Sequence, residues 1–270
     1  MGGPLTSYVA QMVKKRVDTW AAGAGMDDVY GLLRYLARWR SQVLARTYIQ
    51  RQGVKVHGGP FAGMEYLEAP SEGPLISRLL GVYESELHPH IAAAVAKGLD
   101  CVIDVGCAEG YYAVGLARMI PEITVYAYDI EERARTGCAA LAAKNGVSDR
   151  VIIGAEFKPD GFEVFAGRRA LVIVDTEGAE VDILQPALSP VLAGMTIIVE
   201  THDVFHPGAM AMMIERFSPT HEIVRVDQQP KLLELPPWLQ ELPHLDHLLA
   251  VWEWRAAPTP WLVMTPRAGH

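Results

Sequence analysis

The chain has 270 residues, of which half are hydrophobic and 21% are charged, and its formal net charge is −8. This composition is typical of a globular protein with one large core and argues against a largely disordered chain. The negative charge disfavours nucleic acid as a partner, because such binding needs Lys and Arg to neutralise phosphates. The sequence has neither an apolar run long enough to span a membrane nor the pattern of a secretory signal. Its three cysteines lack C-x-x-C spacing, which suits a reducing compartment, so we expect a cytoplasmic protein.

The beginning of the chain differs from the rest in charge. Residues 1–51 carry eight Lys or Arg against three Asp, which leaves sixteen basic against twenty-nine acidic residues in the remainder. Apolar residues recur at helical spacing within 9–20 and again within 29–44, and this pattern predicts two amphipathic helices. We expect residues 1–52 to form an N-terminal helical extension that covers the domain or joins copies into a homo-oligomer. The basic faces of these helices could meet a partner, an acidic membrane surface or water, and the sequence does not choose among them.

Strand-like and helical segments alternate after a Gly- and Pro-rich connection at 53–74 and a helix expected over 79–97. Strands are predicted at 102–106, 123–129, 150–154, 170–175 and 195–201, and helices between them at 110–119, 131–145, 160–167 and 178–192. Strands separated by helix-length segments imply right-handed crossovers and a parallel sheet. The chain continues with a helix at 207–217, a strand at 221–227, a Leu- and Pro-rich segment at 230–243, a helix at 245–254 and a strand at 261–265.

These elements predict an α/β fold, a doubly wound Rossmann-like seven-stranded sheet with the N-terminal helical extension. We place the α/β domain at residues 53–270. The excursion between the last two strands, at about 228–256, is expected to form a lid or wall over a ligand cleft.

A glycine turn after the first strand indicates a nucleoside cofactor. The segment Val102–Gly110 reads VIDVGCAEG, a buried strand followed by a turn whose glycines let backbone amides approach a ligand at a helix N-terminus. Asp129 ends the next strand, where an acid can bind ribose hydroxyls. The dinucleotide fingerprint would need G-x-G-x-x-G, whereas Ala108 stands at its second glycine and Asp104 lies inside the strand. This spacing favours S-adenosylmethionine (SAM) over NAD.

Polar residues also end the later strands. Glu156 and Phe157 follow the third strand, the segment Asp175–Glu180 follows the fourth, and Glu200, Thr201, His202 and Asp203 follow the fifth. Because ligands of open α/β sheets bind outside the carboxyl ends of the strands, these side chains are expected to converge on one rim.

The glycine turn together with Asp129 resembles the class I SAM-dependent methyltransferases. The segment Val174–Leu184, VDTEGAEVDIL, is similar to the D-x-E-G-A-E-x-x-x-L signature of their FkbM-like branch. The segments at 59–64 and 80–87 are also similar to ones that precede the fold in some members. The resemblance covers about residues 58–205 and leaves both ends of the chain, which we expect to hold the substrate determinants, outside it.

The resemblance implies contacts with each part of SAM. Gly106, Ala108 and Gly110 would line its methionine and ribose side, and Asp129 would bind the ribose hydroxyls. Tyr83 and Glu84 would reach the amino acid moiety, and Glu156 and Phe157 would contact adenine. Asp104 would fix the turn or the amino acid end, and Cys107 is expected as a small residue of the turn rather than a nucleophile. The full expected cofactor set is Tyr83, Glu84, Asp104, Gly106, Cys107, Ala108, Gly110, Asp129, Ile130, Glu156, Phe157 and Asp175.

A hydroxyl acceptor must also lose a proton. We expect His202 to be the general base, because an imidazole ordinarily titrates near neutrality, and Asp175 to lie near the methyl-transfer centre. A purely structural role, in which His202 bonds to Asp203 or Glu200, is the alternative. The resemblance to catechol-type enzymes raises a further hypothesis, in which Asp175, Glu200 and Asp203 hold Mg²⁺. The sequence Glu-Thr-His-Asp departs from the adjacent Asp-Asn of that pattern.

The function expected from the sequence is methyl transfer from SAM to a hydroxyl of a small-molecule acceptor, such as a sugar or secondary metabolite. Transfer to nitrogen, to carbon or to a peptide or protein is the enzymatic alternative. A methyltransferase-like binding module without catalysis and an NAD-dependent oxidoreductase are the other hypotheses.

Overall fold

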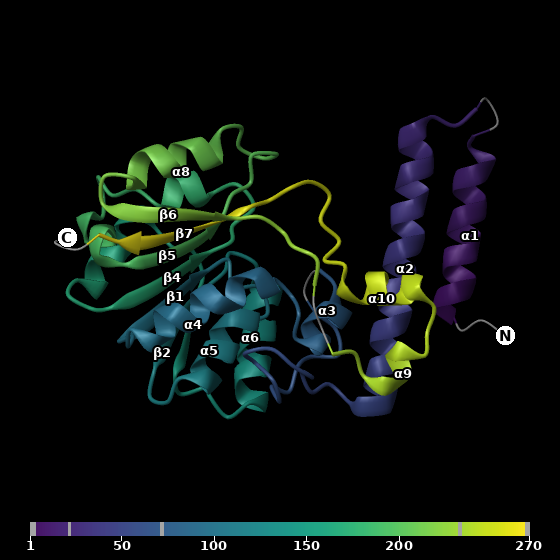
Figure 1. The fold of residues 1–270 in the computed structure, drawn as a ribbon, viewed down its shortest axis with the longest axis horizontal. Helices are drawn as coiled ribbons and strands as arrows, with labels where there is room; N and C mark the ends of the chain where they lie inside the picture. Colours follow the sequence, from purple (N-terminus) through teal and green to yellow (C-terminus); the bar gives the residue numbers. More distant parts are fainter. Residues whose placement is uncertain (1–3, 21–22, 71–72, 232–233, 268–270) are drawn as a thin grey trace.

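A computed structural model of the chain describes residues 4–20, 23–70, 73–231 and 234–267. Its centre is a seven-stranded mixed sheet in the order β3-β2-β1-β4-β5-β7-β6 (Figure 1). The strands are β1 Cys101–Val105, β2 Thr124–Tyr128, β3 Val151–Gly154, β4 Ala170–Val174, β5 Thr196–Glu200, β6 His221–Val226 and β7 Trp261–Pro266. Strands β1 to β5 pair in parallel, whereas β7 runs antiparallel to β5 and β6. The predicted Rossmann-like fold is confirmed, and the strand order reverses between β1 and β4, where such folds bind ligands.

Helices cover both faces of the sheet because alternate residues of each strand point to opposite sides. Val102 of β1 packs on one face with α4 His88–Ala96, α5 Tyr111–Met119 and α6 Glu132–Lys144. Ile103, the next residue, packs on the other face with α8 Ala209–Phe217 and the 3₁₀ helix η2 Pro159–Phe165. Figure 1 shows α8 and α5 on opposite sides of the sheet.

Several predicted helices are broken in the structure. In place of one helix at 178–192 the chain forms α7 Glu180–Ile183 and the 3₁₀ helix η3 Pro190–Gly194, because the prolines there cannot continue a helix. The helix expected at 160–167 is the 3₁₀ helix η2. The helix expected at 79–97 divides into α3 Leu75–Leu80, η1 Ser85–Leu87 and α4, with Gly81 and Glu84 in left-handed conformations between the pieces.

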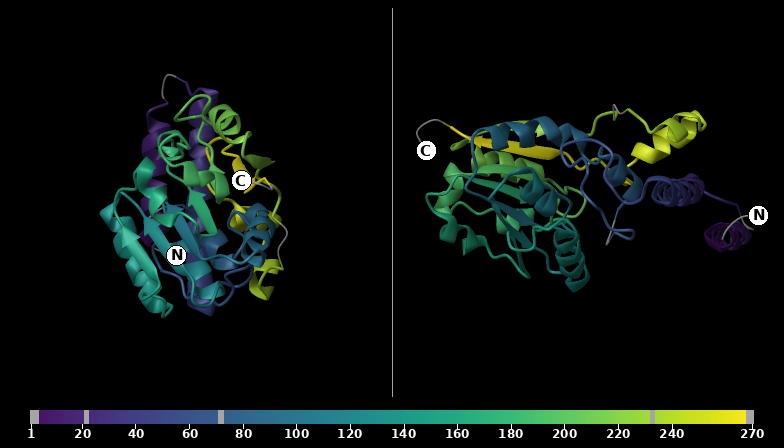
Figure 2. Two further views of the ribbon diagram at one scale, coloured as in Figure 1. Left: turned by 90° about the vertical axis from the view of Figure 1, so that its left-hand side faces the viewer. Right: turned by 90° about the horizontal axis from the view of Figure 1, so that it is seen from below.

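The N-terminal helices meet the segment before the last strand, beside the sheet. Helices α1 Pro4–Asp18 and α2 Met26–Gln52 form a hairpin that projects away from the sheet (Figure 2). The helices of the segment expected as a lid, α9 Pro237–Gln240 and α10 His244–Val251, lie beside α2 (Figure 1). Arg40 of α2 donates to both carboxylate oxygens of Asp246, each at 2.7 Å. Over the described residues, no helix has the length and apolarity needed to cross a membrane.

The Gly- and Pro-rich connection between α2 and α3 is part of the core. Phe61, Met64 and Tyr66 are almost fully buried, and the Phe61 ring contacts the Tyr111 ring of α5 at 5.2 Å between centroids. The N-terminal helices are thereby joined to the sheet domain through a packed segment.

Candidate cofactor and acceptor sites

The turn between β1 and α5 is built around Gly106. Its φ is 82°, and a Cβ at this position would lie 1.6 Å from the carbonyl oxygen of Asp175, so only glycine fits. Ala108 and Gly110 follow in left-handed conformations, with φ of 47° and 91°. The turn therefore brings the end of β1 against the end of β4, at the point where the strand order reverses.

Asp129 holds this turn from the end of β2. One carboxylate oxygen accepts the backbone N–H of Ala108 at 2.9 Å, and the other accepts that of Glu131 at 2.8 Å. Each carboxylate oxygen has two lone pairs, so both can accept a further hydrogen bond from a ribose hydroxyl. Asp129 can thus fix the turn and bind a ligand at once.

A cavity of about 420 Å³, the first cavity, opens at the carboxyl ends of β1 to β4. The residues expected at the cofactor that line it are Gly106, Asp129, Ile130, Glu156, Phe157 and Asp175. Phe157 is buried, and its ring packs against Tyr128 at 4.8 Å and Phe162 at 4.6 Å, so it forms the wall. Side chains from four consecutive strand ends meet here, as the sequence predicts.

Other residues expected at the cofactor lie outside the first cavity. Asp104 is buried behind the turn, where burial raises its pKa to about 7 and its Oδ2 has no hydrogen-bond partner. Cys107, Ala108 and Gly110 belong to the turn but do not line the cavity. Among these, Cys107 is a buried free thiol, consistent with a small residue of the turn.

A second cavity of about 430 Å³ adjoins the first. Its walls include Arg38 of α2, Tyr83, His202 and Arg255. Asp175 and Glu177 line both cavities, so a ligand in either one can reach the same pair of carboxylates.

His202 lies among four carboxylates. Its Nδ1 is 3.2 Å from Glu180 Oε1, and its Nε2 is 3.3 Å from Glu200 Oε2 and 3.7 Å from oxygens of both Asp175 and Glu177. Burial disfavours the charged ring, but the bonds to Glu180 and Glu200 outweigh it and raise the pKa of His202 to about 10. The imidazole is therefore cationic at neutral pH, which differs from the near-neutral titration expected from the sequence.

The pKa values of two carboxyl groups next to His202 are shifted in opposite directions. Burial and the charge of Glu200 raise the pKa of Asp175 well above its usual range. Burial also opposes the charge of Glu200, but His202 and Arg255 outweigh it and lower the pKa of Glu200 to about 2. Asp175 is thus the more basic carboxylate where the two cavities meet.

Arg255 organises the far side of the second cavity and was not predicted. Its guanidinium pairs with Glu84, Glu200 and Glu253. Glu84, expected at the cofactor, lines neither cavity, because its carboxylate binds Arg255 and accepts the hydroxyl of Tyr112 at 2.5 Å. No motif surrounds Arg255, which comes from the loop between α10 and β7, so the sequence offers no signal for it.

The residues expected to hold a cation are only partly brought together. Ligand atoms of Asp175, Glu200 and His202 lie within 4.8 Å of one another. Asp203 is not in this cluster, because its carboxylate accepts the backbone N–H groups of Gly208 and Met210 at the start of α8. His202 replaces Asp203 as the third donor, and oxygen and imidazole donors together suit a divalent metal ion.

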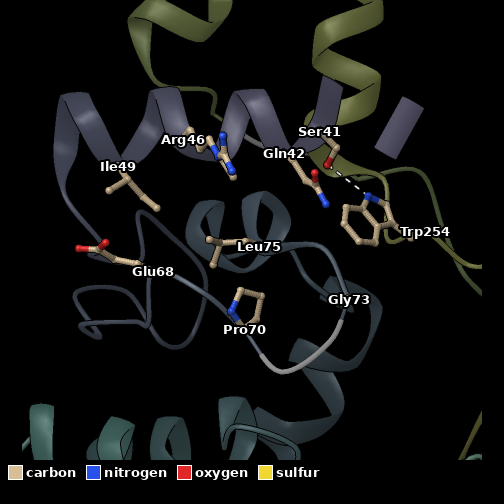
Figure 3. A pocket seen from close by; sticks show the side chains of 10 residues that line it. Ser41, Gln42, Arg46, Ile49, Glu68, Pro70, Gly73, Leu75 and Trp254 are labelled. Atoms are coloured by element: carbon tan, nitrogen blue, oxygen red, sulfur yellow. Dashed lines mark hydrogen bonds between the residues drawn. The ribbon is translucent and has the colours of Figure 1, made fainter. Parts of the chain in front are cut away.

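Helix α2 supports a wall of the second cavity through Trp254. The Trp254 indole donates to Ser41 Oγ at 3.2 Å above a third cavity of about 340 Å³ (Figure 3). Arg34 donates to the Trp254 carbonyl at 3.1 Å, and the Arg38 guanidinium lies 5.4 Å from the Trp254 ring centroid. The N-terminal extension therefore contacts the wall of the second cavity directly.

Comparisons with known proteins relate the chain to methyltransferases. Proteins of Mycobacterium bovis and Mycobacterium tuberculosis, each named an uncharacterized methyltransferase, are 32% identical to it over 111 residues, which are 40% of this chain and 54% of theirs. The chain thus spans about half the length of these relatives. No model of a known protein family matches it.

Solved structures with a similar arrangement include a human methyltransferase 10 domain containing protein, at 10% identity and a TM-score of 0.49, covering 84% of this chain and 97% of that one. An O-methyltransferase from Bacillus cereus, in complex with SAH, has 9% identity and a TM-score of 0.46, covering 84% of this chain and 90% of that one.

Proposed function

We propose that the protein is a SAM-dependent methyltransferase that methylates a hydroxyl group of a small molecule. The observation that carries this proposal is the meeting of the two cavities at Asp175 and Glu177. Group transfer between two bound molecules depends on holding both in line at a shared boundary. The first cavity is proposed to hold the cofactor and the second to hold the acceptor.

The charge of the first cavity supports SAM rather than NAD. Among the residues described along its wall, one is basic, Lys158, and six are acidic: Asp129, Glu131, Glu156, Asp175, Glu177 and Asp182. This wall would repel the pyrophosphate of a dinucleotide and attract the positive sulfonium of SAM. The missing second glycine of the dinucleotide fingerprint agrees with this choice.

Proposed contacts follow from the first cavity's walls. Asp129 accepts the ribose hydroxyls, Glu156 and Phe157 bound the adenine, and Gly106 lets the backbone approach the ligand. Tyr83 lines the second cavity and so would reach the cofactor only near its reacting end.

The proton of the acceptor hydroxyl is proposed to pass to Asp175. SAM, when bound, supplies a methyl group on a positively charged sulfur, and the acceptor oxygen replaces that sulfur on the methyl carbon. The raised pKa of Asp175 makes its carboxylate a stronger base than an ordinary aspartate. His202, 3.7 Å away and cationic, would stabilise negative charge on the acceptor oxygen. We therefore assign His202 an electrostatic role in place of the general base.

Calorimetry with SAM and its demethylated product tests the cofactor. The native chain is expected to bind both, and Asp129→Ala to weaken SAM binding roughly ten- to a hundredfold, because hydrogen bonds to a charged acceptor are lost. Asp149→Ala is the matched control, since this exposed aspartate precedes β3, at the end of the strands opposite to the first cavity. Failure of the native chain to bind either compound would contradict the proposal.

A divalent cation is a second proposal for the same site, favoured by the close donors of Asp175, Glu200 and His202. Mg²⁺ there would hold the acceptor oxygen and lower the pKa of its proton. Titration with Mg²⁺ or Mn²⁺ should then release protons, since His202 must be neutral to bind a metal. Glu200→Gln should abolish this release and Asp203→Asn should retain it. A metal role would be contradicted if the heat and the proton release equalled those of a titration into buffer alone.

The FkbM-like assignment is also a proposal, supported by how its motif is used here. Asp175 lines both cavities, Glu177 and Gly178 turn the chain with positive φ, and Glu180 is buried against His202. The enzymatic alternative is methyl transfer to nitrogen, to carbon or to a peptide or protein. A methyltransferase-like binding module without catalysis is the other alternative.

The proposal also includes the domain boundaries and the cellular compartment. We take residues 1–52 as the helical extension, 53–270 as the methyltransferase domain and 228–256 as a segment that walls the acceptor site through Glu253 and Trp254. The three cysteines of the chain are free thiols, which supports the proposal that the protein acts in a reducing compartment such as the cytoplasm.

A further inference from the structure

One side of α2 changes from exposed to buried along the helix. The exposed residues are Met26, Val29, Tyr30 and Leu33, at 87%, 52%, 56% and 60% of their full exposure, and we call them the α2 stripe. The buried residues are Ser41, Leu44, Ala45 and Tyr48, each fifteen positions later. Fifteen residues are a little more than four helical turns, so the two sets lie about 60° apart around the helix axis. The α2 stripe therefore extends an apolar side that packs on the protein body further along.

Helix α1 does not cover the α2 stripe. Among the residues of α1 whose burial is described, only Val9 is buried. Val9 and Val13 line an apolar groove of about 450 Å³ with Leu36 and Trp39 of α2. Leu36 follows Leu33 by three positions, so the groove adjoins the stripe. A helical hairpin with so little buried surface lacks a core of its own, which a second pair of helices could supply.

We propose that the α2 stripe is the interface for a second copy of this chain, so that two α1–α2 hairpins form a four-helix bundle. In a twofold arrangement the two α2 helices run antiparallel, and Met26 of one copy meets Leu33 of the other. The same register brings Asp27 and Asp28 of one copy within about a turn of Arg34 of the other. Opposite charges thus flank both ends of the apolar contact.

An anionic membrane fits the stripe less well. The charges next to the stripe at the start of α2 are acidic, Asp27 and Asp28, whereas Lys15 and Arg16 lie in the last turn of α1 beside Asp18. Helices that lie on membranes carry Lys and Arg around their apolar face, because anionic lipids repel carboxylates. Arg34 also ties the stripe to Trp254, so a second copy would lie beside the acceptor wall.

Sedimentation velocity on the full chain at micromolar concentrations tests the interface. The native chain is expected at about twice its mass of 29.6 kDa, and Leu33→Glu at the mass of one copy. A buried charge at a small interface should raise the dimer dissociation constant at least about tenfold. Val164→Glu, which changes an exposed valine of η2, is the matched control and should remain dimeric. Circular dichroism should show equal folding of both variants, since each side chain is exposed.

Two results would overturn the proposal. One is a native chain with the mass of one copy, and the other is a dimer that Leu33→Glu leaves intact. Vesicles of phosphatidylserine and phosphatidylcholine provide the competing test. Co-sedimentation of a monomeric native chain with them, lost in Leu33→Glu, would assign the α2 stripe to lipid instead. SAM binding is measured separately, so neither result depends on the proposed activity.

Discussion

The chemistry of the site depends on how Glu180 holds His202. Glu180 is fully buried, and its Oε1 accepts the backbone N–H of His202 at 2.7 Å besides contacting the ring. Glu200 contacts the other ring nitrogen. The sequence indicates that Glu180 and His202 follow neighbouring strands, but the ring's protonation depends on Glu180 at the start of α7 and Glu200 at the end of β5. That arrangement of side chains is not encoded in spacing, so the near-neutral pKa expected for His202 was wrong.

The raised pKa of His202 predicts how its contribution to stability changes with pH. The pKa is about 10 in the folded chain against 6.5 ordinarily, so the stabilisation is present at low pH and is lost as pH rises through 10. Each pKa unit corresponds to about 1.4 kcal/mol, so His202→Gln should cost a few kcal/mol near pH 6.5 and much less near pH 10. Urea unfolding in a chelating buffer measures this, with exposed His244→Gln as control. A cost independent of pH would contradict a cationic His202.

At the level of elements, hydrophobic pattern predicted the sheet well and the helices less well. The predicted strand at 102–106 is β1 at Cys101–Val105, and that at 170–175 is β4 at Ala170–Val174. Buried parallel strands are marked by short apolar runs, which depend little on distant contacts. The helix expected at 178–192 does not form, because Pro186 and Pro190 cannot stand in a helix interior, and Pro190 instead begins η3.

The candidate site was predictable where one strand end determines it. Gly106 and Asp129 follow their strands directly, and both line the first cavity. Glu84 was expected at the cofactor and Arg255 was not predicted, since the ion pair between them spans 171 positions of the chain. Glu84 also has a φ of 48°, a conformation that its sequence neighbours do not indicate. Long-range ion pairs of this kind shape the second cavity, which the sequence predicted least well.

At the scale of the whole molecule, the N-terminal extension and the C-terminal excursion form one layer. Helix α2 packs on α10 and α3 and supports Trp254, so two segments predicted as separate units meet beside the second cavity. Neither segment has a sequence motif that indicates its contact with the other. The pattern of apolar residues alone does not show which helix faces pack together. The wall of the second cavity is therefore built by residues more than two hundred positions apart.

The ion pair between Arg40 and Asp246 should hold this layer together. Its bidentate geometry and the buried Asp246 carboxylate predict a coupling of about 1–2 kcal/mol in a double-mutant cycle of Arg40→Gln and Asp246→Asn. Arg40 lowers the pKa of Asp246, so the coupling is present above the ordinary pKa near 3.8 and is lost as pH falls below it. The exposed pair of Lys14 and Asp18 is the matched control, and its cycle should show little coupling, because solvent screens it. Equal coupling in both cycles, measured by urea unfolding at neutral pH, would show that α2 and α10 are held by apolar packing alone.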